Sequence, residues 1–584
     1  MLREVVRDIF IRALAALRER GDLPEVEIPE FEVERPQIAA HGDYGTNVAM
    51  KLAAAVRSAG GKSNPRTLAE QIAGHVREIV DVVPAYHFIE SVEVAGPGFI
   101  NLRLRPAWVF DQASAILASR NTFGEIDTGR GKRINLEFVS ANPTGPVTVG
   151  NGRGAFIGDA LARVMRAAGF EVTTEYYFND AGAQIEKLGR SMEYYLRLAA
   201  GETAPEKPEE GYFGEYYTTV AQRLRDSNGD DLLKRPADER PAVIGRASAA
   251  IIMADIQATM SRMNITFDVL FREASLGPSG ELSGSIEYLR TAGHLEERDG
   301  AVWAKTSAFG DDKDRVVLRS TGETTYFASD IAYMRNKFLR GYDKLIFVLG
   351  PDHHGYIPRL KAVAQMLGHA ANDMEVLLYQ VVTVRGMRMG KRLGNVITLD
   401  ELYEEVGSDI TRFFYLMRSS DTHLDFDLEL AKKQTDDNPG LSVQYAHARA
   451  AGVFRRANEM GITAAHYAHA NMSSLLNDPE DERPYELALV KQLLRLEEVV
   501  DRAASQLEPH HLTRYGMELA DAFHVFYDHC PILKQNIEVS DDVRYARLTL
   551  LEAAQVGLAR TLTLLGMSAP ERMERVESPD EENQ

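Results

Sequence analysis

The chain has 584 residues, a single cysteine and a formal charge of -20, from 66 Lys and Arg against 86 Asp and Glu. This length exceeds what one hydrophobic core supports, so we expect about three or four domains of roughly 150 residues each. The acidic balance excludes nucleic-acid binding through net charge alone, and an RNA partner therefore requires local basic patches.

The single cysteine and the short apolar runs indicate which cellular compartment and which partners to expect. Cys530 has no second cysteine to pair with, and no CxxC or Cys/His cluster in the sequence offers a zinc site. No apolar run approaches the ~20 residues that a membrane-spanning helix needs. We therefore expect a soluble, cytoplasmic protein with no zinc and no membrane partner.

The first 108 residues predict a small α+β domain. Residues 1–20 repeat apolar residues at helical spacing, and Glu4 and Asp8 interrupt the positive charge that a transit peptide would need. Residues 91–104 alternate polar and apolar side chains, as strands do. Residues 1–108 are therefore interpreted as a separate N-terminal domain.

The next segments alternate strand and helix. Residues 134–139 predict a buried strand, followed by a Pro/Gly-rich loop, a helix from about Gly152 to Ala168 and a strand at 170–178. This order is that of a parallel α/β unit and makes half of a nucleotide-binding fold.

An insertion is predicted to separate the two halves of this fold. Polar stretches at 201–214 and 226–241 flank helical material and favour an insertion at about 185–315. The strand and helix alternation then returns in a strand at 345–349, a helix at 357–367 and a strand at 376–384.

The remainder of the chain predicts helices and a tail. Residues 431–573 are expected to form an all-helical C-terminal domain, and residues 574–584 are acidic, lack apolar anchors and predict a disordered tail. The amphipathic segments of the helical domain are 443–460, 485–507, 515–527 and 543–565.

A first loop that favours phosphate lies at residues 140–154, SANPTGPVTVGNGRG. It stands between the predicted strand and helix, where backbone N–H groups and a helix N-terminus attract anions. A Gly/Pro connection without a ligand is the plain alternative.

A dinucleotide fingerprint is the sharper alternative for this loop. Gly150, Gly152 and Ala155 satisfy G-x-G-x-x-A, which would make the protein an oxidoreductase. Against it, Pro143 and Pro146 interrupt the backbone where a strand should run directly into the first glycine.

A second loop at residues 384–399 places Arg385, Arg388, Lys391 and Arg392 among three glycines after a strand. This pattern suits a mobile clamp on polyphosphate, with a solvated basic turn as the alternative. The two loops together favour an enzyme that activates a small substrate with ATP.

Taken jointly, the loops resemble the two signatures of class I aminoacyl-tRNA synthetases. TVGN at 148–151 stands where that class has HIGH, and RMGKR at 388–392 stands where it has KMSKS. The flanking sequence resembles the arginyl-tRNA synthetases, and the match covers nearly the whole chain. The stretches that carry it are HGDYGTNVAMKLA (41–53), LEFVSANPTGP (136–146), YFNDAGAQ (177–184), TTYFASDIAY (324–333), GPDHHGYIPRLKA (350–362), HLDFDLELA (423–431), VQYAHAR (443–449) and LLGMSAPERM (564–573).

The chain departs from this family pattern at three signature positions. Thr148 and Asn151 stand where HIGH has its histidines, and Gly390 stands where KMSKS has its serine. Thr and Asn can still donate hydrogen bonds to phosphate, so we expect an active but retuned site. The aromatic residues that often precede VQYAHAR are replaced by residues 440–442, Gly-Leu-Ser.

The resemblance implies a class I, Rossmann-like catalytic domain at 109–430 that carries the insertion, with tRNA-binding domains on either side. It implies activation of L-arginine with ATP and Mg²⁺, then transfer to tRNA(Arg), and we expect a monomer. A synthetase for another amino acid and a non-catalytic RNA-binding relative are the alternatives. Both remain open at this stage.

The family's motifs also assign residue roles. Thr148, Gly150, Asn151, Arg388 and Lys391 match catalytic positions. Residues implied to border ATP are Ala141, Pro143, Gly145, Gly152, Gly350, Asp352, His353, His354, Met389 and Arg392. Arginine would be held by Glu137, Asn142, Tyr326 and Asp330, and tRNA contacted by Tyr445, His447 and Arg449. No residue is assigned to a metal.

Overall fold

The computed structural model describes residues 1–23, 26–385, 397–477, 483–533 and 539–573. The chain divides into two compact units. One comprises residues 1–124, 446–499 and 518–560, and the other comprises 125–445, 500–517 and the residues from 561 onward.

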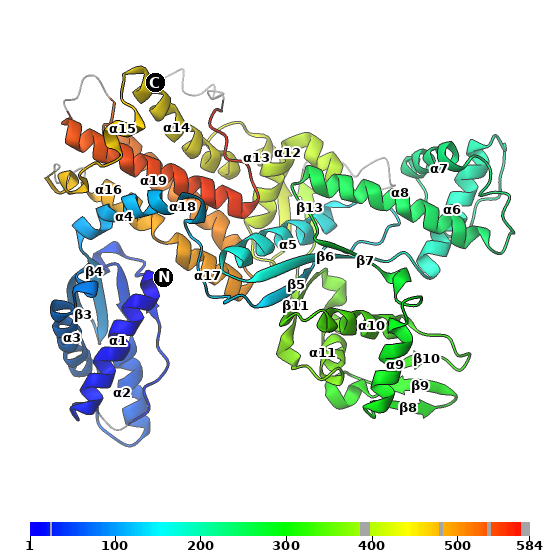
Figure 1. The fold of residues 1–584 in the computed structure, drawn as a ribbon, viewed down its shortest axis with the longest axis horizontal. Coiled ribbons are helices and arrows are strands. Elements are labelled where there is room, and N and C mark those ends of the chain that lie inside the picture. The colour runs from blue at the N-terminus through cyan, green and yellow to red at the C-terminus, as the bar shows by residue number, and fades with distance from the viewer. Residues whose placement is uncertain (24–25, 386–396, 478–482, 534–538, 574–584) are drawn as a thin grey trace. The chain divides into compact units, whose positions relative to one another are not determined.

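A five-stranded parallel sheet forms the centre of the second unit, in the order β12-β11-β5-β6-β7. Helix α5 covers one face, and α10 and α11 cover the other (Figure 1). The expected parallel α/β architecture is confirmed. The elements are β5 Arg133–Glu137, α5 Val149–Ala167, β6 Glu171–Phe178, β7 Val269–Arg272, α10 Tyr326–Leu339, β11 Lys344–Leu349, α11 Ile357–Met366 and β12 Met374–Leu378.

The core beneath α10 and α11 follows from the alternation of side chains along the strands. On β11, Leu345 and Phe347 pack into a cluster with Phe327 and Ile331 of α10 and Val363 of α11. Every second residue of these strands therefore points to the face of the sheet that α10 and α11 cover. A polar residue in the same register is therefore buried under α10.

The expected strand at 376–384 is wrong as a single element. β12 ends at Leu378, and β13 Val382–Arg385 pairs in parallel with β14 Leu424–Asp427 in a separate two-stranded sheet. The chain changes partner between them, since the Tyr379 N–H still donates to Leu349, whereas the Gln380 N–H donates to Ser420. The apolar segment 376–384 therefore contributes strands to two different sheets.

The segment after β5 also differs from its expected bounds. Val139 and Ser140 adopt φ of 66° and 39°, a left-handed conformation that ends the strand at Glu137 rather than at Val139. Helix α5 begins at Val149 rather than near Gly152, because Thr148 caps it. The intervening loop is thus held between a strained turn and a cap.

The range 185–315 holds most of a helical bundle and a small sheet. Helices α6 and α8 pack closely because Gly189 lies against the Pro241 carbonyl and Gly245 against the Ile185 carbonyl. The range also contains β7, which pairs with β6 in the central sheet, and η4 Glu273–Ser275 follows it. The other elements are α6 Ala183–Ala199, α7 Glu215–Asn228, α8 Arg240–Arg262, α9 Glu281–Thr291, β8 Leu295–Arg298, β9 Ala301–Ala304 and β10 Arg315–Leu318.

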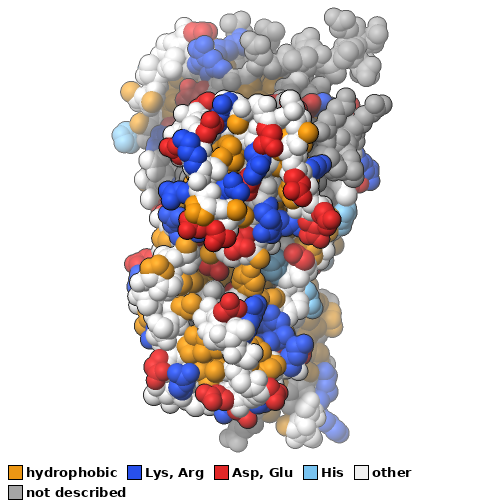
Figure 2. All heavy atoms as spheres, turned by 90° about the vertical axis from the view of Figure 1, so that its right-hand side faces the viewer, with side chains coloured by type: hydrophobic (Ala, Val, Ile, Leu, Met, Phe, Trp, Pro, Cys, Tyr) orange, Lys and Arg blue, Asp and Glu red, His pale blue; other side chains and the backbone are white. Residues whose placement is uncertain are grey.

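One face of this unit shows how its charge is distributed. Acidic and basic side chains are interspersed over α6, α7 and the β8–β10 sheet rather than gathered by sign (Figure 2). Several form pairs, including Lys187 with Glu210 and Arg223 with Asp255. This face carries no broad basic surface among the residues that the structure describes.

Helices form the C-terminal part of the chain, as expected. The predicted helix at 485–507 is wrong in one respect, because it is two helices that separate between Leu493 and Leu496. Both leucines are fully buried, so the chain changes direction without exposing either. The helices are α12 Leu399–Leu416, α13 Leu428–Lys432, α14 Pro439–Glu459, α15 Ala464–Tyr467, α16 Arg483–Leu493, α17 Leu496–Gln506, α18 His510–His529 and α19 Asp541–Leu565.

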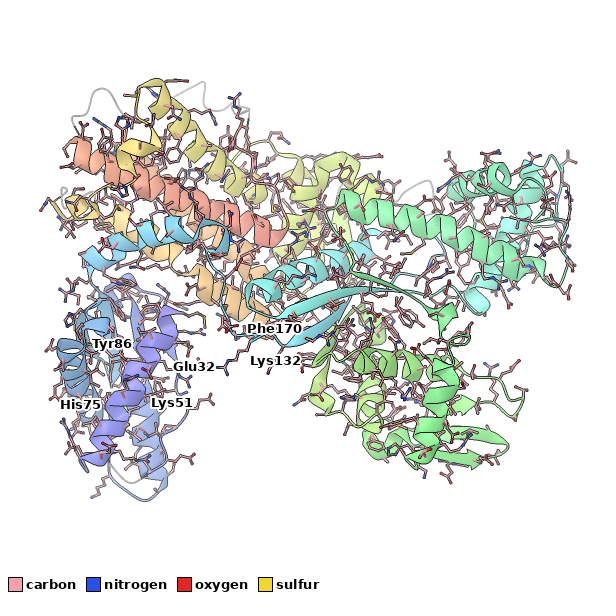
Figure 3. All side chains as sticks on the ribbon, in the orientation of Figure 1. Glu32, Lys51, His75, Tyr86, Lys132 and Phe170 are labelled. Atoms are coloured by element: carbon pink, nitrogen blue, oxygen red, sulfur yellow. The ribbon has the colours of Figure 1, made fainter. Side chains whose placement is uncertain are left out.

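The N-terminal segment is an antiparallel sheet with helices, in the strand order β1-β2-β4-β3, which confirms the expected α+β domain. Lys51 of α2 donates to the Glu30 carbonyl, and buried His75 of α3 pairs with Glu78 (Figure 3). The elements are α1 Leu2–Glu19, β1 Val33–Glu34, β2 Tyr44–Thr46, α2 Val48–Ser58, α3 Pro65–Val82, β3 Ile89–Ala95, β4 Phe99–Leu104 and α4 Pro106–Ser119.

Helices α8 and α19 are long and apolar enough to cross a membrane by length and composition alone. Of their most apolar windows, 50% and 67% is buried inside the protein. Buried core helices pass the same test, so these two helices are weak evidence for a membrane.

Candidate active site

The candidate site lies at the carboxyl edge of the central sheet. From β5 the chain continues through α5 to β6 on one side, and from β11 through α11 to β12 on the other. Because α5 and α11 cover opposite faces (Figure 1), the strand order reverses between the neighbours β5 and β11. Ligands of such sheets bind outside the strand ends at this reversal.

Tyrosines hold the first loop in place. The Tyr176 hydroxyl donates to the Ala141 carbonyl at 2.7 Å, and the Tyr217 hydroxyl donates to the Thr144 carbonyl at 2.7 Å. Pro143 is buried, and a Cβ on Gly145 would lie 3.2 Å from the Tyr217 oxygen. The backbone of the loop is thereby fixed before α5 begins.

Thr148 and Asn151 form a capping box at the start of α5. The Thr148 hydroxyl donates to Asn151 Oδ1 at 2.8 Å, and Thr148 Oγ1 accepts from the Asn151 N–H at 3.4 Å. The two side chains expected to donate to phosphate are therefore bonded to each other. Asn151 also bonds to Tyr379, whose pKa burial raises to about 12.

The first loop lies beside the end of the second. The Val149 N–H donates to the Ile397 carbonyl at 3.1 Å, and the Leu399 N–H donates to the Val147 carbonyl at 2.8 Å. Gly152 allows this close approach, since a Cβ would lie 2.9 Å from the end of the Leu399 side chain. Four residues predicted to contact ATP lie outside the described residues, namely Arg388, Met389, Lys391 and Arg392.

The GPDHH turn meets the same tyrosine. A Cβ on Gly350 would lie 3.7 Å from the Tyr379 oxygen, so Tyr379 adjoins both this turn and Asn151. Asp352 and His354 are exposed, and His353 Nδ1 lies 3.1 Å from Asp352 Oδ1. The structure thus brings the first loop and this turn together.

Helix α10 begins with the residues predicted to hold arginine. Tyr326 is 54% exposed, and its hydroxyl oxygen accepts from the Ala183 N–H at 3.2 Å. The half-buried Asp330 accepts from the Tyr356 hydroxyl at 3.3 Å. Asn142, also predicted to bind arginine, is exposed, and its carbonyl accepts from the Thr144 N–H.

Carboxylates accumulate around Asp330. Burial raises the pKa of Asp330 to about 7, and the charges of Glu273 and Glu137 add to this effect. Burial likewise raises the pKa of Glu273, and the pKa of Tyr177, which faces all three carboxyl groups, is raised. Such a site gains free energy from a cation, and a guanidinium matches carboxylates in charge and geometry.

Comparison with known proteins agrees with this geometry. The family models "Arginyl tRNA synthetase N terminal domain", "tRNA synthetases class I (R), catalytic domain" and "DALR anticodon binding domain" match residues 4–104, 112–414 and 443–573. The arginine–tRNA ligase of Heliobacterium modesticaldum is 41% identical over 98% of this chain and 99% of its own, and that of Geobacter sp. strain M21 is 42% identical over 98% and 100%.

The chain belongs to the arginyl-tRNA synthetase family. It is also similar in fold to the solved arginyl-tRNA synthetase of Thermus thermophilus, with a TM-score of 0.75 at 24% identity over 98% of this chain and 100% of that one. The expected class I fold is thereby confirmed.

Within the arginyl-tRNA synthetase fold, sequence reasoning missed the partners of Glu137. Its Oε1 accepts from the Ser140 hydroxyl at 3.0 Å, while Oε2 lies 2.5 Å from Lys337 Nζ and 2.8 Å from the Tyr333 hydroxyl. Glu137 is 5% exposed. Helical spacing from Asp330 to positions 333 and 337 was the signal that could have found these residues.

Arg153, two residues after the first signature, was also missed. Its guanidinium is buried and donates to the carbonyls of Gln380 at 3.1 Å and Ser419 at 2.8 Å. Burial lowers the pKa of Arg153 to about 10. Arg153 therefore ties α5 to the turn between β12 and β13, which leads toward the second loop.

The residues that the family resemblance assigns to tRNA lie on α14. Tyr445 is half-buried and His447 is 5% exposed. Arg449 Nη1 lies 3.1 Å from His524 Nδ1, and its guanidinium lies 5.3 Å from the centre of the Tyr527 ring. Arg449 is therefore held by α18 in this unit.

The structure also shows a side-chain cluster that the sequence analysis did not expect. Potential metal-ligand atoms of Glu508, His510 and His511 lie within 4.8 Å of one another. Burial lowers the pKa of both histidines, and Arg502 adds to this effect. The cluster lies at the N-terminal end of α18, where the helix dipole disfavours a cation.

Proposed function

We propose that this chain is an arginine–tRNA ligase that uses the site at the sheet edge in two steps. In the first, a carboxylate oxygen of L-arginine attacks the α-phosphorus of ATP, the bond to the β-phosphate breaks, and pyrophosphate leaves arginyl-adenylate. In the second, the 2′-hydroxyl of the terminal adenosine of tRNA(Arg) attacks the arginyl carbonyl, and AMP leaves.

The carboxylate cluster carries this proposal. Asp330, Glu273 and Glu137 concentrate negative charge at the sheet edge. The raised pKa of Asp330 indicates that no nearby positive charge fully balances this carboxylate. A guanidinium supplies the missing charge with paired donors. We propose Glu137, Asn142, Tyr326 and Asp330 as the residues that hold arginine.

The residues proposed for ATP surround the start of α5. Gly150 and Gly152 allow the nucleotide to approach the helix N-terminus, where backbone N–H groups favour phosphate. The magnesium belongs to the ATP complex and enters as part of the substrate. The further proposed ATP residues are Ala141, Pro143, Gly145, Thr148, Asn151, Gly350, Asp352, His353, His354, Arg388, Met389, Lys391 and Arg392.

Positioning and charge neutralisation account for this chemistry without a protein nucleophile. We propose that Lys391 and Arg388 neutralise the pyrophosphate as it leaves. Thr148 and Asn151 fix the first turn of α5 through their mutual hydrogen bonds, so the backbone of that turn presents its N–H groups to phosphate.

The parts assigned to tRNA flank the catalytic range. We propose an N-terminal tRNA-binding domain at 1–108, a catalytic domain at 109–430 with an insertion at 185–315, a helical anticodon domain at 431–573 and an acidic tail at 574–584. Tyr445 and Arg449 are the proposed RNA contacts on α14, and the burial of His447 supports a packing role for that side chain. We further propose a cytoplasmic monomer that needs neither zinc nor a membrane.

Aminoacylation tests the proposal directly. Purified protein is incubated with tRNA(Arg), ATP, Mg²⁺ and labelled arginine, and charged tRNA is counted. ATP–pyrophosphate exchange with tRNA present is then measured for all twenty amino acids. Charging with arginine is expected, whereas exchange driven by another amino acid, or tRNA binding without charging, would contradict the proposal.

A further inference from the structure

A buried charged network lies under the proposed arginine site. The side chain of Lys337 is 0% exposed, and its Nζ lies 2.5 Å from Glu137 Oε2, 2.7 Å from Asn135 Oδ1 and 3.9 Å from Glu175 Oε1. The Tyr333 hydroxyl lies 2.8 Å from Glu137 and 2.6 Å from Glu175. These residues form a continuous polar layer inside the apolar core.

The register of the sheet makes this network necessary. Glu137 of β5 pairs directly with Glu175 of β6, so two carboxylates stand side by side on the face that α10 covers. Like charges at such positions repel, and burial removes the water that would screen them. Arg340 pairs with Glu175 at 2.7 Å, which leaves Lys337 as the cation within hydrogen-bond distance of Glu137 among the described residues.

One face of α10 links this network to the proposed pocket. Tyr326, Asp330, Tyr333 and Lys337 follow one another at spacings of four, three and four residues, which places them on one side of a helix. The first two belong to the proposed arginine site, and the last two contact the Glu137 carboxylate. The rings of Tyr333 and Phe347 enclose the ammonium group, with centroids 4.5 and 4.3 Å from Nζ.

We propose that Lys337 is a positioning residue for arginine recognition, which holds the Glu137 carboxylate in place beside the proposed arginine site and balances its charge. This inference rests on the proposed function. Lys337 occupies Oε2 of Glu137, and Ser140 of the first loop occupies one lone pair of Oε1. Glu137 therefore connects the arginine pocket with the loop assigned to ATP.

Lys337→Gln provides the test, because it removes the charge and keeps a side chain of similar length. The measurement is steady-state aminoacylation by the full-length protein, with arginine and ATP varied separately. We expect the KM for arginine to rise at least about tenfold, as for a lost hydrogen bond to a charged group. The KM for ATP should change less than about threefold.

Lys344→Gln is the matched control. Lys344 lies on the neighbouring strand β11 and forms a partly exposed pair with Glu375, away from the α10 network. Both KM values of this variant should equal those of the wild type. Thermal unfolding of each variant establishes that it is folded.

Tyr333→Phe keeps the proposal testable if Lys337→Gln does not fold. It removes the hydroxyl that donates to the two glutamates and retains the ring beside Lys337, and we expect the arginine KM to rise about threefold or more. The proposal is overturned if a folded Lys337→Gln leaves the arginine KM unchanged or raises both KM values equally, or if Tyr333→Phe leaves it unchanged when it alone folds. A wild type that does not charge arginine contradicts the proposed function instead.

Discussion

Thr148 and Asn151 complete each other's hydrogen bonds across the first turn of α5, with the Thr148 hydroxyl 2.8 Å from Asn151 Oδ1. In the family signature these positions are histidines. The replacement residues form a helix cap, so their polar groups stabilise the turn itself. We therefore propose that the signature in this chain acts on phosphate largely through the backbone that it orients.

Thr148→Val should remove this cap. We expect a loss of about 1 kcal/mol in the free energy of unfolding, because the hydroxyl no longer accepts from the Asn151 N–H. The KM for ATP should rise because the first turn is less ordered. Thr148→Ser retains the hydroxyl and should match the wild type in denaturant unfolding, whereas equal losses in both variants would show that the methyl group matters instead.

Asp330 should make arginine use depend on pH. Its pKa is raised to about 7, so acidification below that value protonates the carboxylate that is proposed to hold the guanidinium. We expect kcat/KM for arginine to fall as the pH drops from 8 to about 6. Asp330→Asn should lower arginine use at every pH, and its residual activity should no longer fall between pH 8 and 6. A pH profile like that of the wild type would contradict this assignment.

Asp330 should also make the stability of the fold depend on pH. Stability is favoured at low pH, where this carboxyl group is protonated, whereas arginine use is favoured at high pH. Because its folded pKa exceeds the ordinary aspartate value of 3.8, Asp330 favours the folded state in its protonated form, and this contribution is lost progressively as pH rises from about 4 to about 7. Without arginine, Asp330→Asn should therefore raise the melting temperature, by more at pH 8 than at pH 5. A lower melting temperature of the variant at pH 8 would argue against the raised pKa.

Gly189 should not tolerate a side chain. A Cβ at this position would lie 1.7 Å from the Pro241 carbonyl oxygen, so Gly189→Ala must push α6 away from α8. We expect a loss of about 1–3 kcal/mol in denaturant unfolding. Gly284→Ala is the control, since this exposed glycine of α9 has open space around its Cα, and alanine there should stabilise the helix by up to about 1 kcal/mol.

The central sheet and several residues of the candidate site could be predicted from the sequence. Short apolar segments marked β5 and β11, the order of strand, loop and helix marked β6, and the family motifs pointed to Tyr326 and Asp330. Apolar patterns do not record which partner a strand takes, so the break after Leu378 was invisible. The break after Leu493 likewise carries no proline or glycine.

Lys337 illustrates the part of the site that the sequence could not reveal. A lysine in a helix usually extends into solvent, and its burial here depends on two glutamates from different strands that become neighbours only through sheet register. The accumulation of carboxylates around Asp330 has the same origin, since Glu273 follows β7 far along the chain. Such contacts arise from the tertiary fold rather than from local pattern.

Lys391 should affect chemistry more than binding. We propose that it neutralises the departing pyrophosphate, a charge that develops as the reaction proceeds. We expect Lys391→Ala to lower kcat by about 100-fold or more while the KM for ATP changes little. Arg385→Ala, at the end of β13 where the second loop starts, shows whether any basic residue of that loop has the same effect. A rise in ATP KM with normal kcat in Lys391→Ala would assign the residue to ground-state binding.

Arg412 should be essential for stability because it joins separate parts of the catalytic unit. Its buried guanidinium lies 2.5 Å from Asp159 of α5 and also donates to the carbonyls of Leu565 and Met263. Arg412→Met leaves Asp159 with half-buried Arg163 and leaves the carbonyls without this donor. We expect a loss of about 3–5 kcal/mol, as for a broken buried pair.

An exposed ion pair sets the scale for this measurement. Arg290 pairs with Glu287 on α9 at 3.0 Å, and both side chains are largely exposed to water. Arg290→Met should therefore cost at most about 1 kcal/mol in the same denaturant experiment. If Arg412→Met were no more destabilising than Arg290→Met, the buried guanidinium would not hold α5, α12 and the end of α19 together.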